Sequence, residues 1–549
     1  MKNVLYSILI AASLISCDLD RFPYDSVASD ELFESEGGLL SATGGSYALL
    51  KGDADGYGFA PQLHRISEYP GDNVSLSGTT TDPLFYSYNY HNITTGYRTN
   101  DIWSSGYKAI VGCNKVIELA TEGESSDSDQ LIGENYYLRA YVYSQLVNVF
   151  GKPYYQGTSN LGVPLKLTSD INDVPDRNTV GEVYEQIVAD LLKAESLMTV
   201  GKTNAYATKE AAQALLSRVY LYMGDNEQAI AYADKVINSG RFSLVPGQEL
   251  GNYFKMVPEE NPETIFCLRY TEESDYTDGW YTVGSLYANV DGSGWGEMYA
   301  SSSYLELVNT HKEDARKGFI SAQFETDENG NKYPAVYWIN ENYTYQFRRT
   351  FDAQGQTFFT EEGVDYQVKE EDVDGQVAYY FTNASNEKIY VTKSFDMYKR
   401  NGYPKFYILK ASGQEGVPHL WSPVVSRLAE LYLIKAEAYA KLNNESMALE
   451  NVNIIRQRAG VPEYESAADF PQGKDLLDVV LDERRLELAF EGHRKFDVFR
   501  NGNTMDRRYP GTHLTGSNPY YEVQPTDDRV IEYIPESQIN AQPSLIQND

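Results

Sequence analysis

The sequence predicts a mainly α-helical protein, in which a scaffold of tetratricopeptide-like helix pairs is interrupted by a long insertion of loops and β-hairpins. Apolar residues recur at helical spacing in three regions, near 103–150, 180–238 and 427–460, and the chain turns back within each region. Between the second and third regions, residues 241–425 consist of short aromatic and β-branched runs separated by glycine-marked turns. These two observations divide the chain into an N-terminal helical part (17–240), the insertion (241–425) and a C-terminal helical part with a tail (426–549).

In the N-terminal part, the small residues of 37–50 predict a closely packed helix. Residues 52–99 are rich in Gly, Asn, Thr and Tyr and predict one long aromatic loop, and loops of that length are usually functional. A helix with Trp103 on its apolar face follows, and a second helix runs from about Glu134 to Phe150.

The later helix pairs are marked by regular spacing and by turn residues. One pair turns at Gly224 and Asp225, and it has about the length of one tetratricopeptide unit. The last pair turns at Asn443 and Asn444 and ends at Gly460. Within the insertion, 377–381 and 389–395 are typical of strands joined as hairpins.

The stretch 482–500, DERRLELAFEGHRKFDVFR, predicts an ion-paired scaffold helix that is interrupted at Gly492. Its charges alternate at spacings of three and four, so each is expected to meet an opposite charge on the same helix; they are Arg484, Glu487, Glu491, Arg494 and Lys495. Arg485 falls on the apolar stripe between Leu481 and Leu488, and we therefore expect it to be buried and paired with a carboxylate.

The overall charge excludes some classes of ligand. The 549 residues include 46 Lys and Arg against 79 Asp and Glu, which gives a net charge of −33. Such a surface repels nucleic acid and anionic lipid, so a neutral ligand fits better. The 46 tyrosines favour recognition of a molecule that is partly flat and partly polar, because tyrosine offers an apolar face and a hydroxyl.

The first residues predict export and a lipid anchor. Lys2 precedes an apolar run, 4–14, that is too short to span a bilayer, and Leu-Ile-Ser-Cys ends at Cys17. This ending resembles a bacterial lipobox, so residues 1–16 are expected to be a signal peptide and Cys17 the site of acylation. The other two cysteines, Cys113 and Cys267, are interpreted as buried free thiols.

Five segments, in order, resemble the SusD/RagB family of surface nutrient-binding lipoproteins. They are 101–118 with Trp103, Tyr107, Ile110 and Asn114; 138–155; 427–442; and the stretch ERRLELAFEGHRKFDVFR with the tail 534–548. The resemblance implies a tetratricopeptide-like superhelix on the outer membrane, facing the cell surface and held there through lipid alone. It also implies an oligosaccharide ligand, a SusC-like TonB-dependent transporter as partner, and neither catalysis nor a cofactor.

The densest aromatic cluster, 276–299, is the candidate ligand site. Aromatic faces stack on the C–H faces of sugar rings, while Asp and Asn bond to the ring hydroxyls. The predicted ligand-binding residues are Asp72, Asn73, Trp280, Tyr281, Trp295 and Tyr299. Trp103 and Trp421 lie beside scaffold helices and are expected in the core, whereas Trp338 falls in the insertion.

Three alternatives stay open at this point. A peptide-capturing protein of the same architecture follows from the RagB branch of the resemblance, and helix repeats also occur in adhesins that dock partners. A glycoside hydrolase requires two carboxylates about 5–10 Å apart, and 79 acidic residues allow such a pair. However, the sequence contains no GxSxG, Walker or HExxH motif.

Calcium is a further alternative for one surface site. The segments 53–58, 327–331 and 372–376 resemble fragments of calcium loops, but each lacks the glutamate at position 12 that completes such a loop. Asn-Gly and Asp-Gly are also ordinary hairpin turns.

Replacing the lipidated residue tests the anchor. Cys17→Ala should leave the fold intact and release a soluble form from the membrane fraction, because lipid alone is expected to hold the protein there. Fractionation followed by mass determination of the N-terminal peptide measures this. Membranes that retain the variant as firmly as the unmodified protein would contradict the lipoprotein interpretation.

Overall fold

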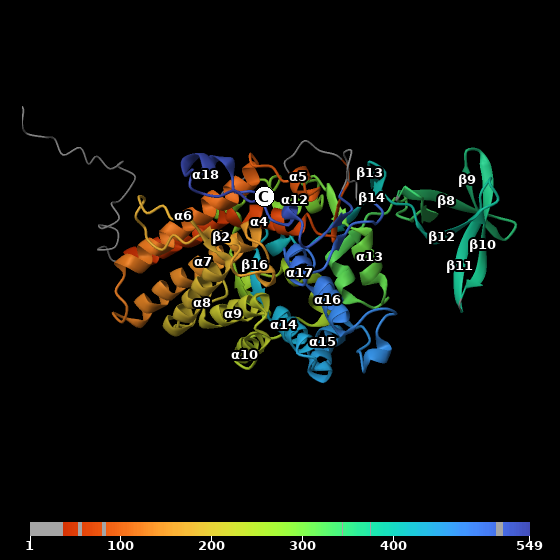
Figure 1. Ribbon diagram of the computed structural model, residues 1–549. Helices are drawn as coiled ribbons and strands as arrows, with labels where there is room; N and C mark the ends of the chain where they lie inside the picture. Colours follow the sequence, from red (N-terminus) through yellow and green to blue (C-terminus); the bar gives the residue numbers. More distant parts are fainter. Residues whose placement is uncertain (1–36, 53–56, 79–83, 343, 374, 512–519) are drawn as a thin grey trace, which may run out of the picture.

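The computed structural model describes residues 37–52, 57–78, 84–342, 344–373, 375–511 and 520–549. A helical body carries a small β-barrel that projects from one side, at the right of Figure 1. The predicted mainly α-helical scaffold of helix pairs with a hairpin-rich insertion is confirmed. Among the helices of the described residues, none is long and apolar enough to cross a membrane.

The N-terminal part of the body contains three of the expected helices and the first helix pair. Its elements are α3 (Gly38–Lys51), α4 (Phe59–Glu68), β1 (Val74–Leu76), α5 (Leu84–Tyr88), α6 (Tyr97–Leu119), α7 (Ser126–Phe150), β2 (Leu161–Pro164), β3 (Arg177–Thr179), α8 (Val180–Leu197), α9 (Lys209–Met223) and α10 (Asn226–Ile237). Thr179 and Glu182 form a capping box at the start of α8. Gly224, with φ 81°, ends α9, and Asp225 caps α10.

The expectation that 52–99 forms one long loop is wrong. Helix α4 occupies Phe59–Glu68, and all of its residues are buried. Its apolar residues Phe59, Leu63 and Ile66 do recur at helical spacing, but the run is short and lies between segments whose Gly, Asn, Thr and Tyr content favours a loop. Gly58 begins α4 with φ 124°, a conformation that favours glycine.

The insertion combines short strands that lie against the body with a closed six-stranded barrel. The short elements are β4 (Thr264–Cys267), α11 (Glu272–Asp275), α12 (Val283–Tyr287), β5 (Met298–Ala300), α13 (Ser302–Asn309), β6 (Ile320–Ala322), β13 (Lys399–Arg400), β14 (Tyr403–Pro404), β15 (Phe406–Ile408) and β16 (Val424–Arg427). The barrel strands are β7 (Pro334–Ile339), β8 (Tyr345–Ala353), β9 (Gln356–Glu361), β10 (Val364–Val373), β11 (Gln376–Thr382) and β12 (Lys388–Phe395).

The barrel has its own core. Neighbouring strands of the barrel pair antiparallel, in the closed order β10-β11-β12-β7-β8-β9. The predicted hairpin of 377–381 and 389–395 is present as β11 and β12. The interior is filled by Val336, Phe359, Val368, Phe381 and Val391, and Trp338 packs against them. Because closure leaves no free edge, the barrel is protected from pairing with other chains.

The C-terminal part contains the last helix pair and the tail. Its elements are α14 (Leu428–Lys441), α15 (Glu445–Ala459), α16 (Leu476–Glu487), α17 (Arg494–Arg500), β17 (Met505–Asp506), β18 (Glu522–Val523) and α18 (Glu536–Ala541). The turn at Asn444, which caps α15, and the end at Gly460 are as predicted. Cys113 and Cys267 are buried free thiols, as expected.

The prediction that the charges of 482–500 pair with one another along a single helix is wrong. Helix α16 ends at Glu487, and the backbone reverses through Phe490 (φ 65°) and Gly492 (φ 80°) before α17 begins. The charges therefore do not lie on one helix, and they pair with residues elsewhere in the fold. Lys495, for example, lies 3.6 Å from Glu532 of the tail.

The charges of this stretch instead build a buried network, here called the Arg427 cluster, formed by Arg427, Arg458, Glu263, Glu487 and Glu491. The guanidinium of Arg427 lies 2.6 Å from both Glu263 and Glu487, and 2.9 Å from Glu491. Arg458 bridges Glu263 at 2.9 Å and Glu487 at 2.5 Å. Burial alone raises the pKa of Glu491, but Arg427 and Lys410 lower it to about 2, so this carboxylate stays charged.

The prediction that Arg485 is buried and paired is confirmed. Its Nε donates to Asn73 Oδ1 at 2.9 Å, and its Nη2 donates to the Asp72 carbonyl at 3.0 Å. The Asp72 carboxylate lies 3.4 Å away, and only 9% of the Arg485 side chain is exposed. The last long helix is thereby joined to the chain that follows α4.

Removing the central arginine tests the energetic role of the cluster. Arg427→Met should lower the free energy of unfolding by about 3–5 kcal/mol, because it removes the cation that three buried carboxylates share and leaves only Arg458 and Lys410 to compensate them. The matched control is Arg508→Met, whose ion pair with Asp506 is half exposed and should contribute at most about 1 kcal/mol. Denaturant unfolding of both variants measures the difference, and equal losses would contradict the role assigned to Arg427.

Candidate functional site

The predicted aromatic cluster 276–299 forms a surface loop around α12, and two of its tryptophans touch. The rings of Trp280 and Trp295 meet edge to face, with 5.1 Å between centroids and 74° between planes. Trp280 is half-buried, whereas Trp295 is 48% exposed and the adjacent Tyr281 is 56% exposed. The loop therefore exposes about half of the Trp295 side chain to solvent, with the Trp280 ring packed against it.

Hydrogen bonds within the loop fix this pair. The indole Nε1 of Trp295 donates to the carbonyl of Trp280 at 3.0 Å. The backbone N–H groups of Trp295 and Gly296 both donate to the Ser285 carbonyl, at 2.7 and 2.9 Å. Since the two tryptophans are bonded to each other and to α12, the geometry exists before any ligand binds.

Side chains from three other segments hold the loop from behind. Arg65 of α4, which is buried, donates to the carbonyl of Tyr281 at 2.8 Å. Arg400 of β13 donates to the carbonyl of Trp295 at 3.0 Å, and the His419 ring lies 3.0 Å from the carbonyl of Ser293. The loop is thus connected to the interior of the body, and its position depends on α4.

Of the predicted ligand residues, Trp280, Tyr281 and Trp295 lie together at the surface, but Tyr299 does not. Tyr299 is fully buried, and its ring stacks on Tyr403 with 5.9 Å between centroids and 8° between planes. It belongs to strand β5, whose three residues are all buried, and so it supports the loop from within.

The structure also places Asp72 and Asn73 away from any ligand-facing position. Asp72 is 5% exposed, and its carboxylate accepts two hydrogen bonds from Arg494, at 2.6 and 2.9 Å. Burial alone raises the pKa of Asp72, but Arg485 and Arg494 hold it well below its usual range. Asn73 is fully buried and bonded to Arg485. Both residues complete the interior network that holds α16 and α17, which their sequence context does not reveal.

Two polar residues of the loop stand beside the tryptophans and were not predicted. Asp278 is exposed, and its carboxylate accepts a hydrogen bond from the backbone N–H of Trp280 at 3.1 Å. Asn289 is also exposed and donates to the Gly294 carbonyl at 2.8 Å. Both residues lie within two positions of an aromatic residue of the same loop, and this proximity could have identified them from the sequence. For Arg400, which comes from a distant hairpin, the sequence carries no signal.

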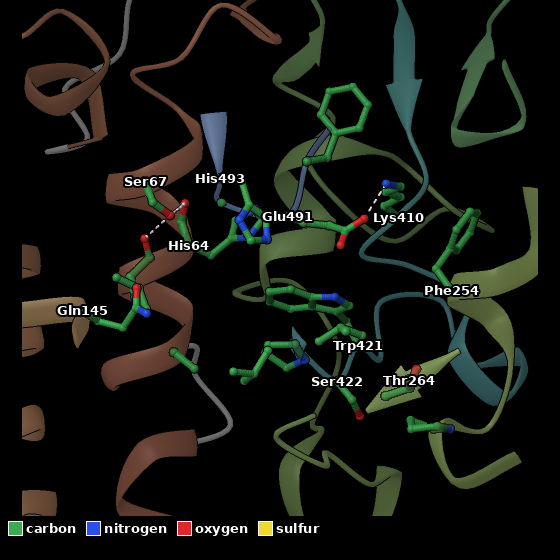
Figure 2. Close-up of a pocket in the computed structure, with 18 of the residues that line it drawn as sticks. His64, Ser67, Gln145, Phe254, Thr264, Lys410, Trp421, Ser422, Glu491 and His493 are labelled. Atoms are coloured by element: carbon green, nitrogen blue, oxygen red, sulfur yellow. Dashed lines mark hydrogen bonds and ion pairs between the residues drawn. The ribbon is translucent and has the colours of Figure 1, made fainter. Parts of the chain in front are cut away.

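An interior cavity of about 100 Å³ is a second candidate, shown in Figure 2. It lies between α4, α7 and the reversal at 491–493, and Trp421 projects toward it. Trp421 is therefore half-buried at a cavity wall, whereas Trp103 is in the core as predicted. The volume is a fraction of the roughly 300 Å³ at which ligand pockets begin, so it suits a few water molecules better than a sugar.

The ionisable groups of the cavity are held in fixed states by their surroundings. Burial lowers the pKa of His64 to about 3 and that of His493 to about 4, so both rings are neutral at pH 7. Lys410 pairs with Glu491 at 2.6 Å across one side of the cavity, as Figure 2 shows. This pairing connects the cavity wall to the Arg427 cluster and points to a structural role.

An open groove of about 590 Å³ between α3 and α6 is a third candidate. Its volume is sufficient for a ligand, but the residues described along it are small or aliphatic, with Lys108 and Lys115 at the polar positions. The groove therefore offers no flat ring, and the Trp280–Trp295 loop fits a sugar better.

No group of three or more His, Cys, Asp or Glu side chains within the described residues is arranged to hold a metal ion. The calcium-loop fragments 53–58 and 372–376 include positions outside the described residues. In the fragment 327–331, Asp327 accepts from the N–H groups of Asn329 and Asn331, each at 2.8 Å, and so closes a turn.

The sequence model of the SusD family matches residues 262–549, which include most of the insertion, the Arg427 cluster and the reversal at Gly492. The chain belongs to the SusD family. A second family model, described as starch-binding and associating with the outer membrane, matches residues 60–221. Together the two matches include α4, most of the helix pairs and the Trp280–Trp295 loop.

Relatives in this family are similar along nearly their whole length. A SusD-like protein of Formosa agariphila is 24% identical over 94% of both chains. The crystal structure of a SusD superfamily protein from Bacteroides thetaiotaomicron has a TM-score of 0.72 at 24% identity, over 95% of this chain and 100% of that one. A SusD-like carbohydrate binding protein from Bacteroides vulgatus has a TM-score of 0.67 at 19% identity, over 93% and 97%. These likenesses show a shared fold.

A glycine substitution tests how tightly the loop is held. At Gly294 (φ 99°) a Cβ atom would lie 2.3 Å from the Ala288 carbonyl oxygen and 2.5 Å from the His419 ring. Gly294→Ala should therefore displace the loop, lower the thermal midpoint and alter tryptophan emission. Gly292 (φ 88°) has no atom within 4 Å of its Cβ position, so Gly292→Ala, the matched control, should cost only the backbone strain of about 1–2 kcal/mol. Identical effects of the two substitutions would contradict the packed loop.

Proposed function

We propose that this protein is a cell-surface lipoprotein that captures a neutral oligosaccharide at the Trp280–Trp295 loop. It would deliver this ligand to a SusC-like TonB-dependent transporter of the outer membrane. The observation that carries the proposal is the exposed, preorganised tryptophan pair beside Tyr281, with Asp278 and Asn289 next to it.

The chemistry of the loop matches a sugar ring. The exposed face of Trp295 can stack on the C–H groups of a pyranose, while the carboxylate of Asp278 and the amide of Asn289 can bond to its hydroxyls. A neutral ligand also agrees with the net charge of −33, which would repel an anionic one. Binding should therefore depend on contact area and hydrogen bonds, and little on salt.

Relatives support the ligand class and the location. The matched family of residues 60–221 is described as starch-binding and associating with the outer membrane, and a solved Bacteroides vulgatus relative is described as carbohydrate binding. The proposed anchor, Cys17, lies outside the described residues and rests on the sequence alone. Transport by a partner would follow from that location.

We expect binding without turnover. Stacking and hydrogen bonding hold a sugar without breaking a bond, whereas glycoside hydrolysis requires two carboxyl groups placed on either side of the scissile bond. No cofactor enters this proposal, because stacking and hydrogen bonding need none.

Alanine substitutions in the full chain test the site. Trp280→Ala and Trp295→Ala should each weaken binding by about 1–3 kcal/mol, by analogy with base–aromatic stacking, without a large change in the melting profile. Tyr155→Ala is the matched control, since this tyrosine is 51% exposed on another part of the body. Calorimetry against soluble starch, xylan, galactomannan and β-glucan oligosaccharides, at low and high salt, measures affinity and salt dependence.

Two outcomes would contradict the proposal. Salt-sensitive binding of a peptide in the same assay, unchanged by both tryptophan substitutions, would indicate the peptide-capturing alternative. Turnover of any of the sugars would place the protein among the glycoside hydrolases.

A further inference from the structure

The barrel carries an aromatic surface that the Trp280–Trp295 loop does not use. On its outer face, Tyr380 of β11 stands opposite Tyr390 of β12, and Ile339 of β7 stands opposite Tyr345 of β8. Strands β12 and β7 pair through Thr392 and Tyr337, so Tyr390 and Ile339 are neighbours two residues further along. The four side chains, here called the barrel stripe, cross four adjacent strands.

The barrel stripe faces outward and is most open to solvent at its two middle residues. Side chains alternate along a strand, and the neighbours of the stripe, Val391 and Phe381, fill the barrel interior. Tyr390 is 53% exposed and Ile339 is 43% exposed, whereas Tyr380 and Tyr345, at the two ends, are half-buried. Large apolar and aromatic side chains that remain exposed in a row are typical of a binding surface.

Polar groups beside Tyr390 are held in place by each other. The Tyr390 hydroxyl donates to Glu371 Oε1 at 2.7 Å, and Lys388 Nζ donates to Glu371 Oε2 at 2.6 Å. Lys388 also lies 4.3 Å from the centroid of the Tyr380 ring. Ala378, the small partner of Glu371 on β11, leaves room for this carboxylate to reach across the strand. The charges of Glu371 and Lys388 compensate each other, so the patch is polar and locally neutral.

A series of contacts joins the barrel stripe to the tryptophan loop. Tyr345 meets Tyr403 edge to face at 5.7 Å, and Tyr403 stacks on Tyr299 of the same loop segment. Across the β13–β14 hairpin, Tyr403 is paired with Arg400, which donates to the Trp295 carbonyl. The two aromatic surfaces are therefore connected through packed side chains. The barrel itself projects away from the helical body (Figure 1).

We propose that the barrel stripe is a second contact surface for the same neutral glycan, and that it binds sugar units beyond those held at the Trp280–Trp295 loop. The inference rests on the proposed function. It follows from the chemistry that the two surfaces share, an exposed aromatic side chain, Tyr390 or Trp295, with carboxylate and amide or ammonium groups beside it. Two linked contacts on one extended chain raise the affinity for long ligands far more than for short ones.

The test compares ligand lengths in the full chain. In Tyr380→Ala/Tyr390→Ala, affinity for a polysaccharide should fall at least about tenfold, whereas affinity for a trisaccharide of the same sugar should stay unchanged. Tyr390→Ala alone serves as a second variant should the double change disturb the barrel. Phe351→Ala is the matched control: this residue is 43% exposed and stacks on Phe358 at the β8–β9 pair, which lies across the barrel from β11–β12.

Native affinity electrophoresis in gels of soluble starch, xylan, galactomannan or β-glucan measures the long ligands, and calorimetry measures the trisaccharides. Unchanged polysaccharide affinity in the double variant, with Trp280→Ala still harmful, would overturn this inference alone. No retention of the unmodified protein by any of the four polysaccharides would overturn the proposed function and this inference together. An effect of the double change on membrane assembly, without any on polysaccharide affinity, would assign the stripe to a protein partner and also overturn it.

Discussion

The structure depends on a set of ion pairs that are almost completely removed from water. Arg427 meets Glu263, Glu487 and Glu491 from three parts of the chain, the start of the insertion and both sides of the break after α16. A buried charge without a partner costs several kcal/mol, so these segments are stable only when they come together. The helix pairs supply the apolar core, and the ion pairs add a constraint on register that apolar contacts alone do not give. In this way the network fixes where the insertion leaves the helical body.

That constraint reaches the surface through α4. Glu68, at the end of α4, accepts from the N–H groups of Phe490 and Gly492 at 3.1 and 2.8 Å, and so closes the reversal after α16. At Gly492 a Cβ atom would lie 2.7 Å from Ser67 Oγ, so the two segments are in direct contact. One turn earlier on α4, Arg65 holds the carbonyl of Tyr281. The tryptophan loop therefore rests on the same helix that seals the ion-paired interior, which explains how a surface loop rich in glycine keeps a defined shape.

Sequence reasoning found the features that depend on local pattern. The helix pairs follow from apolar spacing and caps, and Arg485 follows from a charge on an apolar stripe, so both could be predicted. Helix α4 was missed although Phe59, Leu63 and Ile66 have helical spacing, because the composition of the surrounding segments favours a loop. The partners of 482–500 could not be predicted, because the reversal at Phe490 turns α17 away from α16 and most of these charges meet other segments. The same limit applies to the site. Trp280, Tyr281 and Trp295 lie close in sequence, so their proximity at the surface could be predicted, whereas Asp72 and Asn73 have an exposed-looking loop sequence but interior partners. Closure of the barrel depends on pairing between strands that no single hairpin signal specifies.

We propose that a preorganised surface loop, and not the interior cavity, binds the glycan. Hydrogen exchange followed by mass spectrometry, with and without a polysaccharide that the protein retains, tests it most directly because exchange reports on every segment at once. If the loop is the site, amide exchange in 276–299 should slow on binding. The exchange rates of the segments that line the cavity, 60–67, 410–425 and 490–496, should not change. Protection confined to the cavity segments, with exchange in 276–299 unaltered, would contradict it.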